Sequence, residues 1–96
     1  MKLLTQEIRK ALPALGSQDD KGLEQKVVVK FFTPWANWTW YATEFDGDDI
    51  FFGLVDGFEK ELGYFSLSEL ESLTGPFGLK VERDLHFSNK KLSELY

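Results

Sequence analysis

The fold of this chain is decided by residues 37–55, NWTWYATEFDGDDIFFGLV. Two runs rich in aromatic and β-branched residues, 37–45 and 50–55, flank the sequence DGDD at 46–49. Asp and Gly favour tight turns, whereas aromatic and β-branched side chains favour strands. The stretch therefore predicts a β-hairpin.

The sequence on either side extends this hairpin. Further strands are predicted at 26–33 and 61–65, because both segments have the same strand-favouring composition. The loops that join them to the hairpin, at 33–36 and 56–60, are short, and short loops connect antiparallel neighbours. We therefore expect a four-stranded antiparallel β-meander.

An amphipathic helix is predicted before the sheet, over residues 5–12. Apolar side chains recur at helical spacing from Leu4 to Leu15, Thr5 is a suitable N-cap, and Pro13 cannot continue a helix. The next segment, 16–22, has two glycines and no apolar periodicity. This pattern predicts a mobile loop.

A second helix is predicted directly after the meander. Ser66 followed three residues later by Glu69 is the signature of a capping box. The Gly-Pro pair at 75–76 then ends the helix. A short extended piece at 80–87 precedes a last helical turn at about 89–95.

Length and composition indicate a single α+β domain over residues 1–96. A chain of 96 residues that is 43% hydrophobic can enclose one core. No stretch approaches the roughly 20 apolar residues that cross a bilayer, and the polar start does not resemble a signal peptide, so we expect a cytoplasmic protein. With no cysteine, the chain has neither disulfides nor thiolate metal ligands. We expect no cofactor.

The charge distribution suggests which partners the protein can bind. A formal net charge of -5 argues against direct nucleic-acid binding, which requires clustered Lys and Arg, and favours a basic protein partner. The window 44–61 holds seven acids against the single base Lys60. Its two turns, 46–49 and 56–60, should lie at opposite ends of a meander, so we expect two acidic ends and not one patch.

Aromatic and acidic side chains are the candidates for partner binding. Alternation puts Trp38 and Trp40 on one face of their strand, which we interpret as core, and Tyr41 on the other. Trp35 follows Pro34 in a hairpin loop, so we expect it to be largely exposed and to anchor a partner, although a packed Trp35 would be core. The predicted partner-binding residues are Trp35, Tyr41, Asp46, Asp48 and Asp49.

Residues suited to catalysis or metal binding are sparse. His86 is the single histidine, with Asp84 two positions before it, and zinc sites use several His or Cys ligands. A calcium loop starting at Asp46 would put Phe51 where glycine is required. The sequence contains no nucleophile elbow and no phosphate-binding glycine loop. We therefore expect no catalytic and no metal site, and an enzyme centred on His86 is the least favoured alternative.

Six motifs, spread over nearly the whole chain, carry a family resemblance. They are KLLT at 2–5, KFFTP at 30–34, NWTWYATE at 37–44, FFGLV at 51–55, ELGYFSLSEL at 61–70 and ERDLHF at 82–87. Through them the chain resembles a bacterial domain-of-unknown-function family common on plasmids, conjugative elements and phages. The resemblance implies a protein of a mobile genetic element, and such elements must survive host restriction and CRISPR defence.

The resemblance and the charge together predict a class of function. We expect a non-enzymatic protein that inhibits a host defence complex by protein–protein contact, as an anti-CRISPR or anti-restriction protein. Its partner would be a basic, nucleic-acid-binding defence protein. The main alternative is a structural or regulatory accessory domain of plasmid or phage maintenance.

Overall fold

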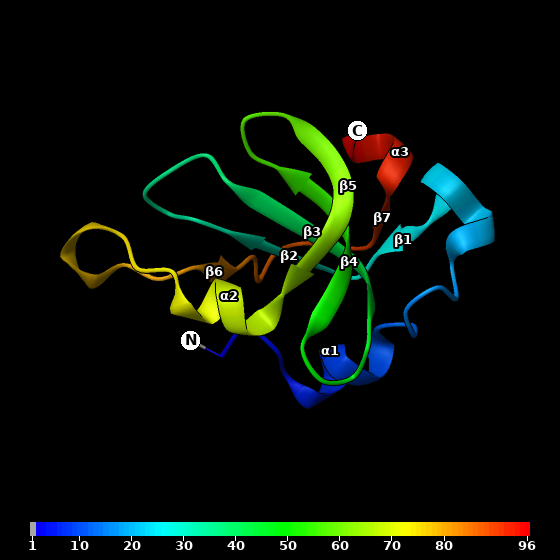
Figure 1. Ribbon diagram of the computed structural model, residues 1–96, viewed down its shortest axis with the longest axis horizontal. Helices are drawn as coiled ribbons and strands as arrows, with labels where there is room; N and C mark the ends of the chain where they lie inside the picture. Colours follow the sequence, from blue (N-terminus) through cyan, green and yellow to red (C-terminus); the bar gives the residue numbers. More distant parts are fainter. Residues whose placement is uncertain (1) are drawn as a thin grey trace.

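A five-stranded antiparallel sheet forms the centre of the computed structural model, which describes residues 2–96 (Figure 1). The strand order is β5-β4-β3-β2-β6, so that the predicted meander of four consecutive strands is confirmed. A fifth strand, β6, pairs with β2. It lies within residues 80–87, which were predicted to be extended but not to join the sheet. The strands are β2 (Val29–Phe32), β3 (Thr39–Phe45), β4 (Ile50–Asp56), β5 (Lys60–Ser66) and β6 (Glu82–Arg83).

The helices are short, and their caps follow the sequence signals. In α1 (Gln6–Ala11) the Thr5 side chain accepts the N–H of Ile8, and in α2 (Leu67–Ser72) the Ser66 side chain accepts the N–H of Glu69. The C-terminal turn is α3 (Leu92–Leu95). The α+β class is therefore confirmed. Two 3-10 turns, η1 (Asp19–Glu24) and η2 (Pro76–Gly78), complete the helical elements of the described residues.

Each face of the sheet carries a core of its own. One face packs against α1 and α2, and its main core includes the fully buried rings of Phe31 and Phe51. The other face carries a smaller core of Val27, Leu54 and Leu92. In Figure 1, α1 and α2 lie along the lower side of the sheet and α3 lies at its upper right. Because β4 supplies both Phe51 and Leu54, both of its faces are covered.

The segment 16–22, predicted as a mobile loop, is tied to the sheet at its start and enters η1 at Asp19. The Glu44 carboxylate is only 1% exposed, and it accepts the N–H groups of Gly16 at 2.9 Å and Gln18 at 2.7 Å. The Gln18 side chain is buried in turn and donates to the Thr43 carbonyl at 2.8 Å. These bonds hold the segment against β3, because a buried carboxylate must keep its donors.

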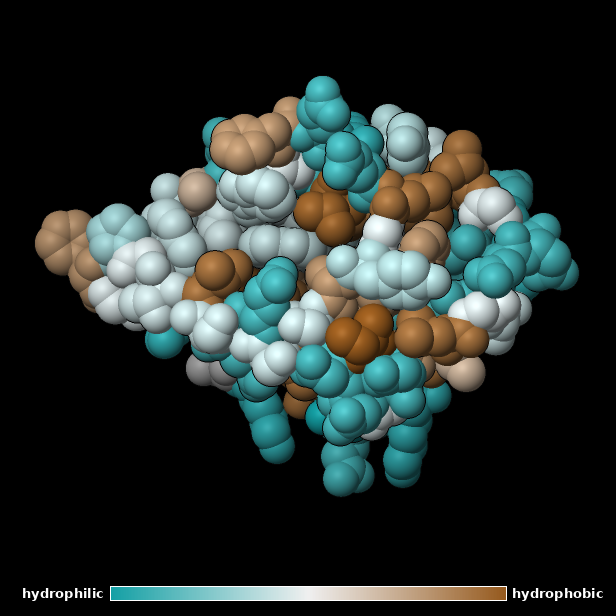
Figure 2. Space-filling view, in the orientation of Figure 1, coloured by the Kyte–Doolittle hydropathy of each residue, from teal (hydrophilic) through white to brown (hydrophobic). Residues whose placement is uncertain are grey.

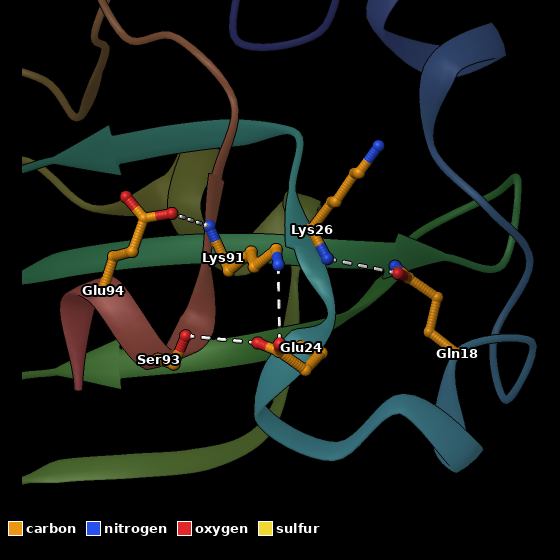
Figure 3. A network of polar contacts seen from close by, with 6 residues as sticks. All are labelled: Gln18, Glu24, Lys26, Lys91, Ser93 and Glu94. Atoms are coloured by element: carbon orange, nitrogen blue, oxygen red, sulfur yellow. Dashed lines mark hydrogen bonds and ion pairs between the residues drawn. The ribbon is translucent and has the colours of Figure 1, made fainter.

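Polar contacts also tie the C-terminal end to Glu24, the last residue of η1, and to the strand that follows it (Figure 3). The two-residue strands β1 (Lys26–Val27) and β7 (Lys90–Lys91) pair with each other. Beside them the Glu24 carboxylate contacts the Lys91 ammonium and the Ser93 hydroxyl, each at 3.4 Å. This second, smaller sheet places α3 over the smaller core.

Candidate partner-binding site

An apolar groove opens on the face of the sheet that α2 covers. Its volume is about 410 Å³, and all three tryptophans of the chain line it. We call it the tryptophan groove; the side chains that define it are Trp35, Trp38, Trp40, Phe65, Glu69 and Leu73. Trp40 is buried in the main core and also lines the groove, while Trp35 and Trp38 are half-buried.

The tryptophan positions correct one prediction and confirm another. Trp38 and Trp40 do share a side of the sheet, and their rings stack with centroids 6.0 Å apart. The prediction that Trp35 is largely exposed is wrong. Trp35 packs against the main core and, like Trp38, is half-buried. The loop after Pro34 folds back over the sheet, which gives Trp35 both a packing role and a place in the groove wall.

Two glycines make room for these indoles. A Cβ atom added at Gly57 would lie 2.2 Å from the Trp38 ring, and one added at Gly75 would lie 2.2 Å from the Trp35 ring. Neither distance leaves space for a methyl group, so each ring lies directly on a glycine backbone. The lack of side chains at these two positions therefore allows the half-buried tryptophans to pack there.

Two phenylalanines are almost fully exposed to solvent, and sequence reasoning missed both. Phe58, at the β4–β5 turn, is 94% exposed and meets the Trp38 ring edge-on at 5.4 Å. Phe77, in η2, is 104% exposed and has a φ of 57°, a left-handed conformation that bulky residues rarely adopt. Figure 2 shows hydrophobic surface at the left tip, where the loop containing η2 projects in Figure 1. The sequence signal that could have predicted their exposure is an aromatic residue among turn-forming residues, as Phe77 is between Pro76 and Gly78.

Acidic side chains surround the groove. Glu69 lies in its lining, on α2. A smaller adjoining hollow shares Trp38 and Val55 with the groove and is lined by Glu59 and Glu61 as well. Neither lining contains a lysine or an arginine. The surface around the indoles is therefore apolar at its centre and negative at its edge.

Tyr41 lies on the opposite face of the sheet from the groove. It packs with the smaller core, 6.2 Å from the Phe87 ring, and the Lys30 ammonium lies 5.9 Å from its ring centroid. Lys30 in turn pairs with Asp84 at 3.4 Å. Tyr41 and Trp35 were predicted to serve one interface, but the structure does not bring them together.

The acidic turn at 46–49 is also separate from the groove. It lies at the end of β4 opposite to Asp56, as the register of β3 and β4 requires, so the expectation of two acidic ends is confirmed. The Asp46 carboxylate accepts the N–H groups of Asp48, Asp49 and Ile50 at 2.8 to 3.0 Å. These donors, that of Asp48 foremost, hold the pKa of Asp46 below its ordinary value.

The other two acids of this turn differ in their surroundings. The Asp49 carboxylate accepts the N–H and the hydroxyl of Ser68, at 2.8 and 3.0 Å, at the start of α2. Asp48 is exposed, and within residues 2–96 its carboxylate makes no hydrogen bond or ion pair. Of the three acids predicted to contact a partner, Asp46 and Asp49 therefore stabilise the turn and the start of α2. Only the Asp48 carboxylate is left without a hydrogen bond among the described residues.

His86 is exposed on a turn, with few groups around it that could assist chemistry. Its backbone N–H donates to Asp84 at 2.9 Å, and this bond, with Lys30 next, lowers the pKa of Asp84. Across the described part of the chain, no three His, Cys, Asp or Glu side chains gather in a way that could hold a metal ion. The prediction of an extended piece at 80–87 is therefore wrong at His86, which lies on a turn after the end of β6 at Arg83.

Comparison with protein families identifies the family of this chain. A family model described as "Protein of unknown function (DUF2958)" covers residues 3–96. The chain belongs to the DUF2958 family. Neither the curated proteins nor the solved structures contain a match to this DUF2958 chain. The resemblance to a domain-of-unknown-function family is thereby confirmed over nearly the whole length. In addition, no helix within residues 2–96 is long and apolar enough to cross a membrane.

Proposed function

We propose that this protein is a non-enzymatic, cytoplasmic protein of a mobile genetic element that inhibits a host defence complex by protein–protein contact. Its target would be a basic, nucleic-acid-binding protein of a CRISPR or restriction system. The tryptophan groove is the proposed contact site. The origin on a mobile element rests on the sequence resemblance, and the mode of action rests on the groove.

The observation that carries this proposal is the concentration of aromatic surface at one end of the sheet. Three indoles line the groove, and the exposed ring of Phe58 meets one of them, Trp38, edge-on. Contiguous exposed apolar surface on a small domain usually marks an interaction site. Tryptophan is among the residues most enriched at the energetic centres of protein interfaces.

Electrostatics supports a basic target. The net charge of -5 gives long-range attraction to a positively charged protein, and Glu59, Glu61 and Glu69 lie beside the groove. Complementary charge speeds encounter, whereas buried aromatic contacts supply most of the affinity. A defence nuclease, whose nucleic-acid channel is basic, fits this description.

Capture from a host strain with intact defence systems tests the proposal. The tagged protein is expressed in that strain, and the co-purified proteins are identified by mass spectrometry. We expect a defence nuclease among them, and less of it with Trp35→Leu than with wild type. Recovery of only maintenance proteins encoded by the mobile element would instead support the accessory-domain alternative. Loss of cellular phenotype in a folded His86→Ala variant would support an enzyme.

A further inference from the structure

We propose that the tryptophan groove receives an arginine side chain of the partner, with Glu69 as its counter-charge. This inference rests on the proposed function, because it names the chemistry that the partner presents to the groove. It follows from three features of the site: the indole rings, the acids at the rim and the lack of a basic residue in the lining.

The rings supply the first part of the argument. The faces of indole rings are electron-rich, and of the aromatic side chains tryptophan attracts a cation most strongly. Trp35 and Trp38 are half-buried in the groove wall, where each packs against the protein and lies directly on a glycine backbone. A cation that enters the groove therefore meets ring surface that is already positioned, so little side-chain entropy is lost on binding.

The acids supply the second part. The groove and the adjoining hollow, of about 260 Å³, share Trp38 and Val55, so one segment of a partner can lie along both. Three glutamates line the pair: Glu69 in the groove, and Glu59 and Glu61 in the hollow. No residue of either lining can neutralise them, and the nearby Lys60 ammonium donates to the Leu95 carbonyl near the C-terminus.

Two other aromatic clusters of the protein, around Phe45 and around Tyr41, are approached by cations of the same chain. The Arg9 guanidinium lies 5.4 Å from the Phe45 ring centroid, and Lys30 lies over Tyr41. The tryptophan groove has rings and acids but no such cation in its lining. A partner residue is thus the natural source of the positive charge that completes it.

Arginine fits the groove better than lysine. The guanidinium group is planar and weakly hydrated, and it can stack on an aromatic face while its N–H groups reach a carboxylate. The lysine ammonium is compact and strongly hydrated, so its transfer into an apolar groove costs more. A nucleic-acid-binding protein also offers arginine on its surface, because phosphate recognition uses it.

Titration with a single amino-acid derivative tests the inference directly. The probes are N-acetyl-arginine amide and N-acetyl-citrulline amide, which have similar shapes but differ in charge. The readout is the NMR signals of the three indole N–H groups, assigned with tryptophan variants, at constant ionic strength. We expect arginine to shift the Trp35 and Trp38 signals with saturation and citrulline to leave them almost unchanged. Equal binding of the two probes would overturn the inference.

A pair of variants on α2 supplies the matched control. Glu69 and Glu71 are both exposed, and replacing either with glutamine changes the net charge equally, but only Glu69 lines the groove. Glu69→Gln should weaken arginine binding about two- to five-fold, the range of an exposed ion pair, and Glu71→Gln should leave it unchanged within error. Equal effects of the two variants would show that arginine binding depends only on the net charge of the protein, and would overturn the proposed pairing with Glu69.

The outcome is separable from that of the proposed function. If Trp35→Leu weakens capture of the cellular target but arginine does not bind the groove, the inference fails and the proposed function stands. If arginine binds as described and no defence protein is captured, the proposed function fails, and the groove remains a site for arginine.

Discussion

The exposed phenylalanine in η2 should destabilise the protein, so that its replacement makes the fold more stable. Phe77 has φ 57° and ψ 26°, the left-handed region, in a turn closed by the Gly75 N–H to the Leu79 carbonyl at 2.7 Å. A bulky side chain in this region crowds its own backbone. Asparagine adopts the same conformation more readily, because its short polar side chain can hydrogen-bond locally.

The structure sets the sign and size of the effect of Phe77→Asn. The ring is 104% exposed, so its removal forfeits no buried apolar area. The left-handed conformation costs an ordinary residue about 1 to 2 kcal/mol, of which asparagine avoids a large part. We therefore expect the free energy of unfolding to rise by about 1 kcal/mol. For a domain of this size that change corresponds to an increase in Tm of about 4 to 8 °C.

Urea unfolding of wild type, Phe77→Asn and Phe77→Leu measures this difference. Leucine removes the ring but retains a side chain that disfavours positive φ, so its stability should stay within about 0.5 kcal/mol of wild type. A loss of stability in the asparagine variant would refute the reasoning, because it would show that the ring packs against the protein in solution. A gain in stability with weaker target binding would show that the strain is kept for function.

Three further predictions concern the buried acid, the groove and the acidic turn. Glu44→Ala leaves the N–H groups of Gly16 and Gln18 without their acceptor; because Gln18 is buried and Gly16 is exposed, we expect a cost of about 1 to 3 kcal/mol in urea unfolding, that of one buried unpaired donor, and a cost below about 1 would contradict the role of Glu44. Gly75→Ala should shift the Trp35 indole N–H signal, because the new methyl group overlaps the ring; an unchanged signal would contradict the packing. Because the native pKa of Asp46 is lowered, its carboxylate stabilises the fold above the ordinary aspartate pKa of about 3.9, and this contribution is lost as the pH falls through the native value. Asp46→Asn should therefore flatten the acid limb of stability against pH, and an unaltered limb would exclude this turn as its source.

Local sequence signals predicted most of the fold. Strand runs, short loops and two N-caps each involve residues close together in the chain, so the meander, α1 and α2 could be derived from spacing alone. The pairing of β6 with β2, by contrast, joins segments about 50 residues apart through only two residues of β6. Neither strand composition nor turn chemistry reports such a contact.

The buried acid shows why strict alternation misleads. Continued alternation in β3 would place Glu44 on the same face as Trp40 and Ala42. The register shifts between Ala42 and Glu44, and this bulge turns Glu44 away from that face and brings Phe45 to the main core. Because of this bulge, the Glu44 carboxylate accepts hydrogen bonds from Gly16 and Gln18 and holds the segment after α1 against β3.

The groove could be predicted only in part. Three tryptophans within six residues indicated an aromatic site, but the space that admits Trp35 comes from Gly75, which lies 40 positions later in the chain. The five predicted partner-binding residues were chosen by exposure and charge expected from local sequence. Folding distributes them over two faces and two ends of the sheet, because Trp35 and the three aspartates lie in the loops at either end of β3, and Tyr41 points to the face opposite the groove.

The central claim is that the tryptophan groove binds the partner protein, and the affinity of the captured target tests it most directly. Calorimetry compares wild type, Trp35→Leu and Leu85→Ser, each checked for folding by circular dichroism; Leu85 is exposed and lies outside the groove lining. The groove account predicts a Kd at least about 30-fold weaker for Trp35→Leu, which corresponds to about 2 kcal/mol, and an unchanged Kd for Leu85→Ser. Equal affinity of a folded Trp35→Leu variant and wild type would contradict it.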